Sequence, residues 1–340
     1  MFKASDIGID LGTANILVYV KGKGIVLREP SVVAIDTVRN KVLAVGEEAK
    51  EMLGRSPQNI EAIRPLREGV IANYTITQKL LAHVIRKVAG KNLFFKPRVM
   101  TCVPIGITSV EKRAVMEATS QGGAAKTYLI EEPLAAALGA GIDITKPKGN
   151  MVVDIGGGTT DIAVLSLGGI VVSDSVRVGG DHFDEDITAF VKKKYNVNIG
   201  ERTAEEIKVN IATVAPAGRD EVITVRGRDM VNGLPKTFTV TSADCREALA
   251  DSVASLIGAV KYVLENCPPE LASDIVDNGI YLTGGGALLD GLAEVIERET
   301  GIVARVADNP LDCVAEGTGK ALEDLDKLHP GTVYTASNLE

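Results

Sequence analysis

The chain has 340 residues, of which 45% are hydrophobic and 24% charged, and its net charge is -8. This length predicts more than one domain, and this composition is that of a globular protein. The negative net charge argues against a nucleic-acid partner, because phosphate backbones are bound by basic surfaces.

The cysteines Cys102, Cys245, Cys267 and Cys313 are scattered and form no CxxC pair. We therefore expect reduced thiols in a cytosolic protein rather than a disulfide framework or a zinc site. No apolar run approaches the length of a membrane span, and the first residues show no signal-peptide pattern.

Residues 7–20, IGIDLGTANILVYV, predict a β-hairpin with a polar, glycine-containing turn. This first loop carries Asp10, Gly12, Thr13, Ala14 and Asn15. Further strand-like segments follow as far as residue 45, and a short helix is expected after them.

A helix-period pattern covers residues 75–89, and the segment 91–98 that follows it reads KNLFFKPR. Leu93, Phe94 and Phe95 therefore form an apolar triplet between basic residues. Two interpretations remain open for this triplet. It belongs to the core, or it is a membrane-inserting tip whose basic neighbours meet anionic head groups.

Residues 129–141, LIEEPLAAALGAG, predict a strand end followed by an alanine-rich helix with Pro133 in its first turn. Glu132 directly precedes that proline. From the residues alone, Glu132 is an N-terminal helix charge favoured by the helix dipole. The polar joint at residues 144–150, ITKPKGN, then predicts a domain boundary.

Residues 151–168, MVVDIGGGTTDIAVLSLG, predict a second hairpin with the same order of parts. This second loop carries Asp154, the glycines 156–158 and Thr159. Glycines let the backbone approach a ligand closely, and successive amides in such a turn can bind an anion. A carboxylate beside that anion needs a cation between them, and a polyphosphate with Mg²⁺ supplies both. An ordinary glycine-rich hairpin fits the local pattern too, but the duplication favours two related lobes facing one nucleotide.

Two further segments add candidate residues. Gly179 and Gly180 precede a predicted helix, where a glycine pair suits a phosphate or ribose contact. Residues 200–211, GERTAEEIKVNI, begin another helix, in which Thr203 and Glu206 fit a capping box.

The C-terminal part is predicted as a long helix over residues 242–265, a strand followed by the glycines 284–286, and a last helix over residues 310–328. That last segment contains GTGKA, which mimics the end of a Walker A loop. It lacks both the upstream glycine and the Ser or Thr after the lysine, so we reject a phosphate-binding role for it.

The segments DIGIDLGTAN and DIGGGTTDIAV resemble the two phosphate loops of the actin/Hsp70/sugar-kinase superfamily. With GERTAEEIK, PPEL and LTGGGALLDG, the resemblance narrows to the MreB family of bacterial actins, from about residue 6 to about residue 328. It implies an α/β, actin-like (ribonuclease H-like) ATPase fold with two lobes. Each lobe is then a mixed five-stranded sheet with helices and a smaller inserted subdomain.

The resemblance also predicts the limits of these lobes. The first lobe is expected at residues 1–146 plus 316–340, with an inserted subdomain at about 33–67. The second lobe is expected at residues 147–315, with an inserted subdomain at about 185–242.

By resemblance, Asp10 and Asp154 hold Mg²⁺ through its waters, which Mg²⁺ gives up reluctantly. Glu132 and Thr159 order the water that attacks the γ-phosphate. Many superfamily members carry a lysine in the first loop, where this chain has Asn15, so Mg²⁺ and backbone amides must neutralise more of the phosphate charge. The implied nucleotide contacts are Gly12, Thr13, Ala14, Asn15, Gly156, Gly157, Gly158, Thr159, Gly179, Gly180, Glu205, Lys208, Gly284, Gly285 and Gly286.

The function implied is a slow ATPase, with ATP and Mg²⁺ as cofactors, that polymerises on the inner face of the plasma membrane and guides cell-wall synthesis in a rod-shaped bacterium. The resemblance favours membrane binding by Leu93, Phe94 and Phe95. Implied partners are further copies of the chain, the membrane adaptor RodZ, and the elongation machinery of MreC, MreD, RodA and a transpeptidase.

Two alternatives on the same fold are a small-molecule kinase and an Hsp70-like ATPase domain. The kinase lacks an evident catalytic aspartate with an acceptor pocket, and the chaperone would need a substrate-binding domain beyond residue 340.

Overall fold

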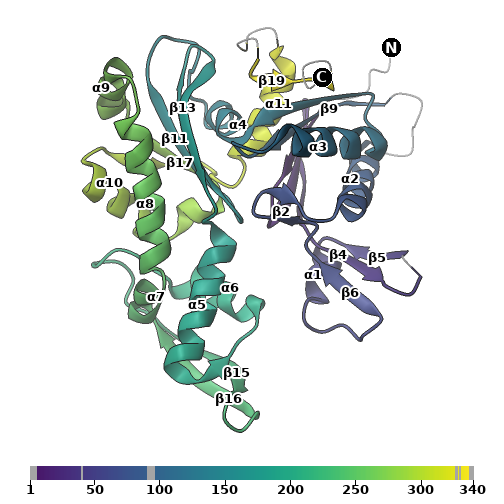
Figure 1. Cartoon of the computed structure of the whole chain (residues 1–340), viewed down its shortest axis with the longest axis vertical. Coiled ribbons are helices and arrows are strands. Elements are labelled where there is room, and N and C mark those ends of the chain that lie inside the picture. The colour runs from purple at the N-terminus through teal and green to yellow at the C-terminus, as the bar shows by residue number, and fades with distance from the viewer. Residues whose placement is uncertain (1–5, 40, 90–95, 326–327, 329–330, 337–340) are drawn as a thin grey trace.

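The computed structural model describes residues 6–39, 41–89, 96–325, 328 and 331–336. Two large sheets lie side by side in its upper part, and two small sheets lie below them at the same end of the molecule (Figure 1). The apolar triplet Leu93, Phe94 and Phe95 lies outside the described residues. None of the described helices is long and apolar enough to cross a membrane.

The first sheet has the strand order β19-β10-β9-β1-β2-β3. Strands β1 to β3 are antiparallel neighbours, whereas β9 and β10 run parallel to β1. The bounds are β1 (Ile7–Leu11), β2 (Asn15–Val20), β3 (Gly24–Pro30), β9 (Arg98–Val103), β10 (Lys126–Glu131) and β19 (Val333–Tyr334).

The second sheet has the order β13-β12-β11-β17-β18 and repeats this plan, with three antiparallel strands followed by two parallel ones. Its strands are β11 (Asn150–Ile155), β12 (Thr160–Ser166), β13 (Gly169–Val176), β17 (Ile280–Thr283) and β18 (Ala304–Val306). The expected five-stranded sheet is thus found in both lobes, and the first adds the two-residue strand β19 at its edge.

Helices cover both faces of the two sheets, because the central strands are buried on both sides. Val99 and Val103 of β9 pack with helices α2 and α3, while Met100 and Cys102 face α4 and α11 between the sheets. The helices are α2 (Tyr74–Ala89), α3 (Ser109–Gly122), α4 (Glu132–Gly139), α8 (Ala250–Glu265), α9 (Pro269–Asn278), α10 (Leu292–Thr300) and α11 (Cys313–Glu323).

The two small sheets complete the fold. One contains β4 (Val33–Asp36), β5 (Lys41–Val45) and β6 (Ile60–Ile63) beside α1 (Glu47–Glu51), and a short hairpin β7 (Leu66–Arg67) and β8 (Val70–Ile71) follows. The other contains β14 (Val197–Asn198), β15 (Val222–Asp229) and β16 (Pro235–Thr241) with α5 (Gly180–Tyr195), α6 (Glu201–Ile211) and α7 (Ser242–Ala248). The exact lobe limits stay a prediction.

The observed helix starts show which of the capping patterns in the sequence form capping boxes. The Thr108 side chain accepts from the Glu111 amide in a complete capping box, as its Thr-x-x-Glu pattern indicates. The capping box at Thr203 and Glu206 is wrong, because α6 already begins at Glu201 after Gly200. The long helix over residues 242–265 is divided at Leu249 into α7 and α8.

Helices α4 and α11 cross between the two large sheets with their backbones in contact (Figure 1). A Cβ on Gly139 would lie 1.8 Å from the Cys313 carbonyl oxygen, and one on Gly317 would lie 1.7 Å from the Ala135 oxygen. Only glycine permits this approach. Gly317 belongs to the GTGKA segment, so its glycine packs a helix crossing, in keeping with the rejection of a Walker A loop.

Candidate functional site

A cavity of about 420 Å³ lies between the two lobes and is lined by both predicted loops. This volume lies within the usual range for small-molecule sites. Every residue predicted to contact the nucleotide, metal or attacking water lines this cavity, except Gly179. These residues are Asp10, Gly12, Thr13, Ala14, Asn15, Glu132, Asp154, Gly156, Gly157, Gly158, Thr159, Gly180, Glu205, Lys208, Gly284, Gly285 and Gly286.

Asp10 on β1 and Asp154 on β11 bring two buried carboxylates to the cavity. Burial, followed by the negative charge of Asp154, raises the pKa of Asp10 to about 7. Burial raises the pKa of Asp154 to about 6, although the Thr283 hydroxyl donates to its Oδ1 at 2.7 Å. A divalent cation would relieve both the desolvation and the repulsion, so these residues fit a magnesium ion.

No group of three or more His, Cys, Asp or Glu side chains is arranged to hold a metal among the residues that the structure describes. A magnesium ion at Asp10 and Asp154 would therefore complete its coordination with water and ligand oxygens. Oxygen ligands and retained waters are what Mg²⁺ prefers.

The two loops pack directly against each other. A Cβ on Gly157 would lie 2.8 Å from the Ala14 Cβ, and one on Gly158 would lie 2.8 Å from the Glu68 Cα. Within the first lobe, Thr13 Oγ1 accepts a hydrogen bond from the Gly69 amide at 3.0 Å and so joins the first loop to the segment that contains Glu68. Two of the three glycines in the second loop are thus required by packing between the lobes.

The glycine pair at the start of α5 holds the second loop rather than an open ligand position. The Gly180 amide donates to the Gly156 carbonyl at 2.9 Å, and the Asp181 amide donates to the Gly157 carbonyl at 2.8 Å. A Cβ on Gly179 would lie 2.7 Å from both of those carbonyl oxygens. Gly180 still lines the cavity, whereas the nucleotide contact predicted for Gly179 stays a prediction.

Glu132 begins α4 at the end of β10 and faces the cavity. Burial, followed by the charges of Asp161, Asp154 and Asp10, raises the pKa of Glu132 well above its usual value. Thr159, the other residue predicted to order water, is buried and lines the same cavity. Their predicted catalytic roles require a cation to offset this concentration of carboxylates.

Sequence reasoning overlooked the partners of these acids. The Cys102 thiol on β9 lies 3.3 Å from Asp10 Oδ1 and 3.9 Å from Glu132 Oε1. Asp161 on β12 is fully buried and accepts from the Ile105 amide at 2.8 Å, and burial raises its pKa to about 7. The hairpin register, which pairs Asp154 with Asp161, is the signal that could have found Asp161.

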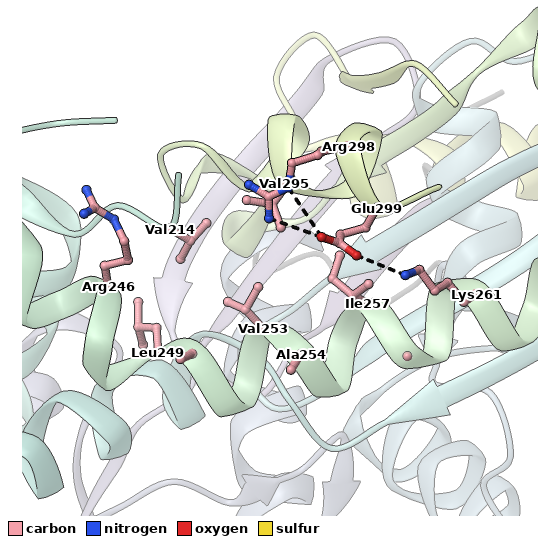
Figure 2. Close-up of a pocket in the computed structure, with 12 residues that line it drawn as sticks. Val214, Arg246, Leu249, Val253, Ala254, Ile257, Lys261, Val295, Arg298 and Glu299 are labelled. Carbon is pink, nitrogen blue, oxygen red and sulfur yellow. Dashed lines mark hydrogen bonds and ion pairs between the residues drawn. The ribbon is translucent and has the colours of Figure 1, made fainter. Parts of the chain in front are cut away.

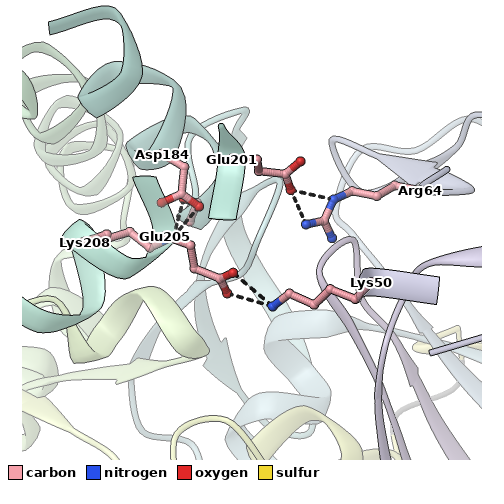
Figure 3. A network of polar contacts seen from close by, with 7 residues as sticks. Lys50, Arg64, Asp184, Glu201, Glu205 and Lys208 are labelled. Carbon is pink, nitrogen blue, oxygen red and sulfur yellow. Dashed lines mark hydrogen bonds and ion pairs between the residues drawn. The ribbon is translucent and has the colours of Figure 1, made fainter. Parts of the chain in front are cut away.

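At the cavity mouth, ion pairs join the two small subdomains (Figure 3). Lys50 Nζ on α1 lies 2.9 Å from Glu205 Oε2 on α6, and Arg64 pairs with Glu201. Lys208 donates to Asp184 Oδ2 at 2.8 Å. Glu205 and Lys208, the two residues predicted at the ribose and adenine, therefore both have protein partners.

Apolar side chains line another part of the cavity and remain open to solvent. Val209, Leu288 and Leu311 are 64%, 54% and 49% exposed, respectively, and all three line the cavity. The motifs did not reveal them. An aromatic base lying against these side chains would cover apolar surface that is otherwise in water.

A second cavity, of about 450 Å³, lies between α8 and α10 (Figure 2). It shares no described lining residue with the first and contains neither loop. Its acidic residue Glu299 is already paired with Lys261 at 3.0 Å and with Arg298 at 3.3 Å. We therefore place the candidate site in the first cavity.

The sequence matches the MreB/Mbl protein family model over residues 4–330, which is nearly the whole chain. The chain belongs to the MreB/Mbl family. Among its relatives, the cell shape-determining protein Mbl of Bacillus subtilis is 58% identical over 325 residues, covering 96% of this chain and 98% of Mbl. The cell shape-determining protein MreB of Escherichia coli is 52% identical over 338 residues, covering 98% of this chain and 97% of that protein.

Solved structures agree with this MreB/Mbl assignment. MreB 5 of Spiroplasma citri, bound to AMPPNP, superposes with a TM-score of 0.91 at 38% identity, covering 96% of this chain and 98% of its own. The MamK double helical filament has a TM-score of 0.81 at 21% identity, over 94% and 99% of the two chains, and supports the actin-like fold. The kinase and Hsp70-like interpretations are therefore not favoured.

Proposed function

We propose that this protein is an ATP-hydrolysing bacterial actin that forms filaments on the inner face of the cytoplasmic membrane and thereby organises cell-wall synthesis. The observation that carries the proposal is the meeting of two carboxylate–glycine loops, one from each lobe, around a single cavity. Mbl and MreB relatives named for cell-shape determination, and an MreB 5 bound to AMPPNP and to ADP, support it.

In this proposal, the phosphates, the ribose and the base of the nucleotide contact different parts of the cavity. Backbone amides of residues 12–15 and 156–159 bind the phosphates, and the apolar side chains of Val209, Leu288 and Leu311 cover the base. Asp10 and Asp154 hold Mg²⁺, which neutralises phosphate charge when bound. Glu205 and Lys208 reach the ribose and adenine edge.

Hydrolysis depends on orienting a water molecule, because phosphoryl transfer needs little covalent chemistry from the protein. Glu132 accepts a proton or a hydrogen bond from that water, and Thr159 fixes it from the opposite lobe. Burial and the neighbouring carboxylates raise the pKa of Glu132, so a cation that offsets those charges favours the ionised form that can act as a base. Hydrolysis is therefore expected to be slow and dependent on Mg²⁺.

The enzymatic test compares Glu132→Gln with Glu131→Gln under saturating Mg-ATP. Glu131 is the adjacent carboxylate, but it pairs with Lys112 and Tyr334 and does not line the cavity. Phosphate release should fall at least about 100-fold in Glu132→Gln, as expected for loss of a general base, and stay near wild type in Glu131→Gln. Equal rates in the two variants would contradict the role of Glu132.

Filament formation on membranes is tested by pelleting with Mg-ATP, with and without vesicles containing anionic lipid. The wild type should pellet with ATP and co-sediment with vesicles. Replacing Leu93, Phe94 and Phe95 together by Ser should abolish vesicle binding while ATP-dependent pelleting persists. Val38→Ser, a change at a residue that is 81% exposed in the turn between β4 and β5, serves as the control and should bind vesicles normally.

The partners and location follow from the same proposal. We expect the protein in the cytoplasm at the membrane, with RodZ and the MreC, MreD, RodA and transpeptidase machinery as partners. Affinity capture from cells, with the Ser-substituted triplet as the control, would test whether membrane attachment precedes these contacts.

A further inference from the structure

The strand order of the first sheet places the Cys102 thiol between two carboxylates, Asp10, which is proposed to hold Mg²⁺, and Glu132, which is proposed to order water. Strand β9 lies between β1 and β10, and its register sets Ile9 opposite Thr101 and Ile130 opposite Cys102. Cys102 is only 2% exposed. Its Sγ lies 3.3 Å from Asp10 Oδ1 and 3.9 Å from Glu132 Oε1.

The second sheet carries a donor at the corresponding position. Strand β17 runs parallel to β11, as β9 runs parallel to β1, and Thr283 is paired with Asp154. The Thr283 hydroxyl donates to Asp154 Oδ1 at 2.7 Å. Each lobe therefore sets a side-chain donor on the neighbouring parallel strand against its own loop aspartate.

The two donors differ in what else they touch. In the second lobe the short hydroxyl contact serves Asp154 alone among the described contacts of Thr283. In the first lobe the sulfur is larger, its hydrogen bond to Asp10 is longer, and it also reaches Glu132. A donor on one oxygen of Asp10 leaves the other oxygen free for a ligand in the cavity.

We infer that Cys102 is a positioning residue of the ATPase reaction, which links the metal-side carboxylate of Asp10 to the water-side carboxylate of Glu132. The inference rests on the proposed function. Cys102 is not among the described residues that line the cavity, so its thiol acts through the two carboxylates. The hydrogen bond from the thiol holds the Asp10 carboxylate in place, and the contact of the sulfur with Glu132 sets the distance between the two carboxylates.

The test uses two replacements of almost equal shape, Cys102→Thr and Cys102→Val. Thr supplies a hydroxyl donor, as Thr283 does in the second lobe, whereas Val supplies none. Positioning through the hydrogen bond predicts that Val lowers kcat about tenfold and that Thr restores most of it. A purely packing role predicts the opposite order, because Val suits an apolar interior better than Thr.

A second readout separates positioning from general damage. In Cys102→Val, the Mg²⁺ concentration for half-maximal rate should rise severalfold, while KM for ATP at saturating Mg²⁺ stays within about twofold. Cys245→Val replaces another buried cysteine, on α7 away from the cavity, and should change neither quantity. Melting temperatures of all three variants establish that each is folded, and Cys102→Ala replaces Val if Val does not fold.

The outcomes distinguish this inference from the proposed function. If the wild type hydrolyses ATP but Cys102→Val keeps its rate and its Mg²⁺ requirement, the inference is overturned alone. Val equal to or faster than Thr also overturns it. If the wild type shows no Mg²⁺-dependent hydrolysis, the proposed function fails first, and the inference fails with it.

Discussion

The two lobes share one plan but hold their loops differently. In the second lobe a hydroxyl donates to Asp154 at 2.7 Å, and burial raises the pKa of this acid to about 6. In the first lobe a thiol lies 3.3 Å from Asp10, and burial and the charge of Asp154 raise the pKa of Asp10 to about 7. Asp154 thus has the shorter hydrogen bond and the lower pKa, and is the better of the two aspartates at binding a cation near neutral pH.

The junctions after the last parallel strand differ even more. In the first lobe the junction between β10 and α4 presents the carboxylate Glu132 to the cavity. In the second lobe the matching junction between β18 and α11 presents Pro310 and Leu311. Both lobes therefore contribute a binding loop of the same kind, but their strand–helix junctions differ. The junction with Glu132 is suited to binding water, and the junction with Leu311 is suited to packing against an apolar ring.

The largest effect is expected from Gly158→Val in the second loop. The first Cβ would already lie 2.8 Å from the Glu68 Cα and from Thr13 Oγ1, so the lobes would be forced apart. We expect ATP affinity to fall about 100-fold, measured by fluorescent-nucleotide titration. Gly258→Val on α8, where a Cβ meets nothing within 4 Å, is the control and should bind ATP normally.

Leu311→Ser tests whether the second junction serves binding where the first serves chemistry. Losing the apolar contact with the base should raise KM for ATP about tenfold and leave kcat near wild type. Glu132→Gln should show the reverse pattern in the same steady-state assay. A large fall in kcat for Leu311→Ser would contradict this division of roles.

The unequal aspartates predict a pH dependence. Since Asp10 and Asp154 must be deprotonated to hold Mg²⁺, affinity for Mg²⁺ should rise by up to about tenfold per pH unit for each proton displaced, and level off above about pH 7. Calorimetric titrations between pH 5.5 and 8 measure it. Asp154→Asn should remove the step near pH 6 and move the remaining step to below pH 7, because the charge of Asp154 contributes to the raised pKa of Asp10.

The same shifts set the sign for the metal-free protein. The folded state binds more protons than the unfolded state between the usual aspartate pKa and the raised values, so stability should fall as pH rises through this window. The melting temperature without Mg²⁺ should accordingly drop less between pH 5 and 7.5 in Asp10→Asn than in the wild type. An equal drop would show that Asp10 does not carry the effect.

The smallest effect is expected at the mouth of the cavity. Lys50→Ala removes a partly exposed ion pair with Glu205, and such pairs contribute roughly 0.2–1 kcal/mol. ATP should dissociate about twofold to fivefold faster, measured by stopped-flow displacement, and the difference should shrink at high salt. Lys261→Ala breaks a comparable pair with Glu299 away from the cavity and is the control.

The sequence indicated those parts of the site that lie on continuous motifs. Both loops, Glu132 and the glycines 284–286 were predicted from local order and resemblance, and the structure brings them to one cavity. Cys102 and Thr283 were overlooked, because their roles depend on which strands become parallel neighbours. Periodicity within a segment contains no information on that pairing.

Contacts between the lobes were the least predictable. Arg64 pairs with Glu201 of the opposite lobe, a contact that no local sequence pattern indicates. Glu205 was assigned by resemblance to the nucleotide, and its ion pair with Lys50 joins residues far apart in the chain. Such pairs depend on how far the cleft is closed, which no local pattern encodes.

The crossing of α4 and α11 has a mechanical consequence. The two helices touch through Gly139 and Gly317 and therefore meet backbone to backbone. When one lobe rotates relative to the other, few interlocked side chains have to separate at this crossing. The crossing between the two large sheets then acts as a fixed pivot, and nearly all the displacement falls at the small subdomains at the opposite end of the molecule. Nucleotide exchange is thus expected to proceed by a scissor-like spreading of the two small subdomains, and not by separation at the crossing.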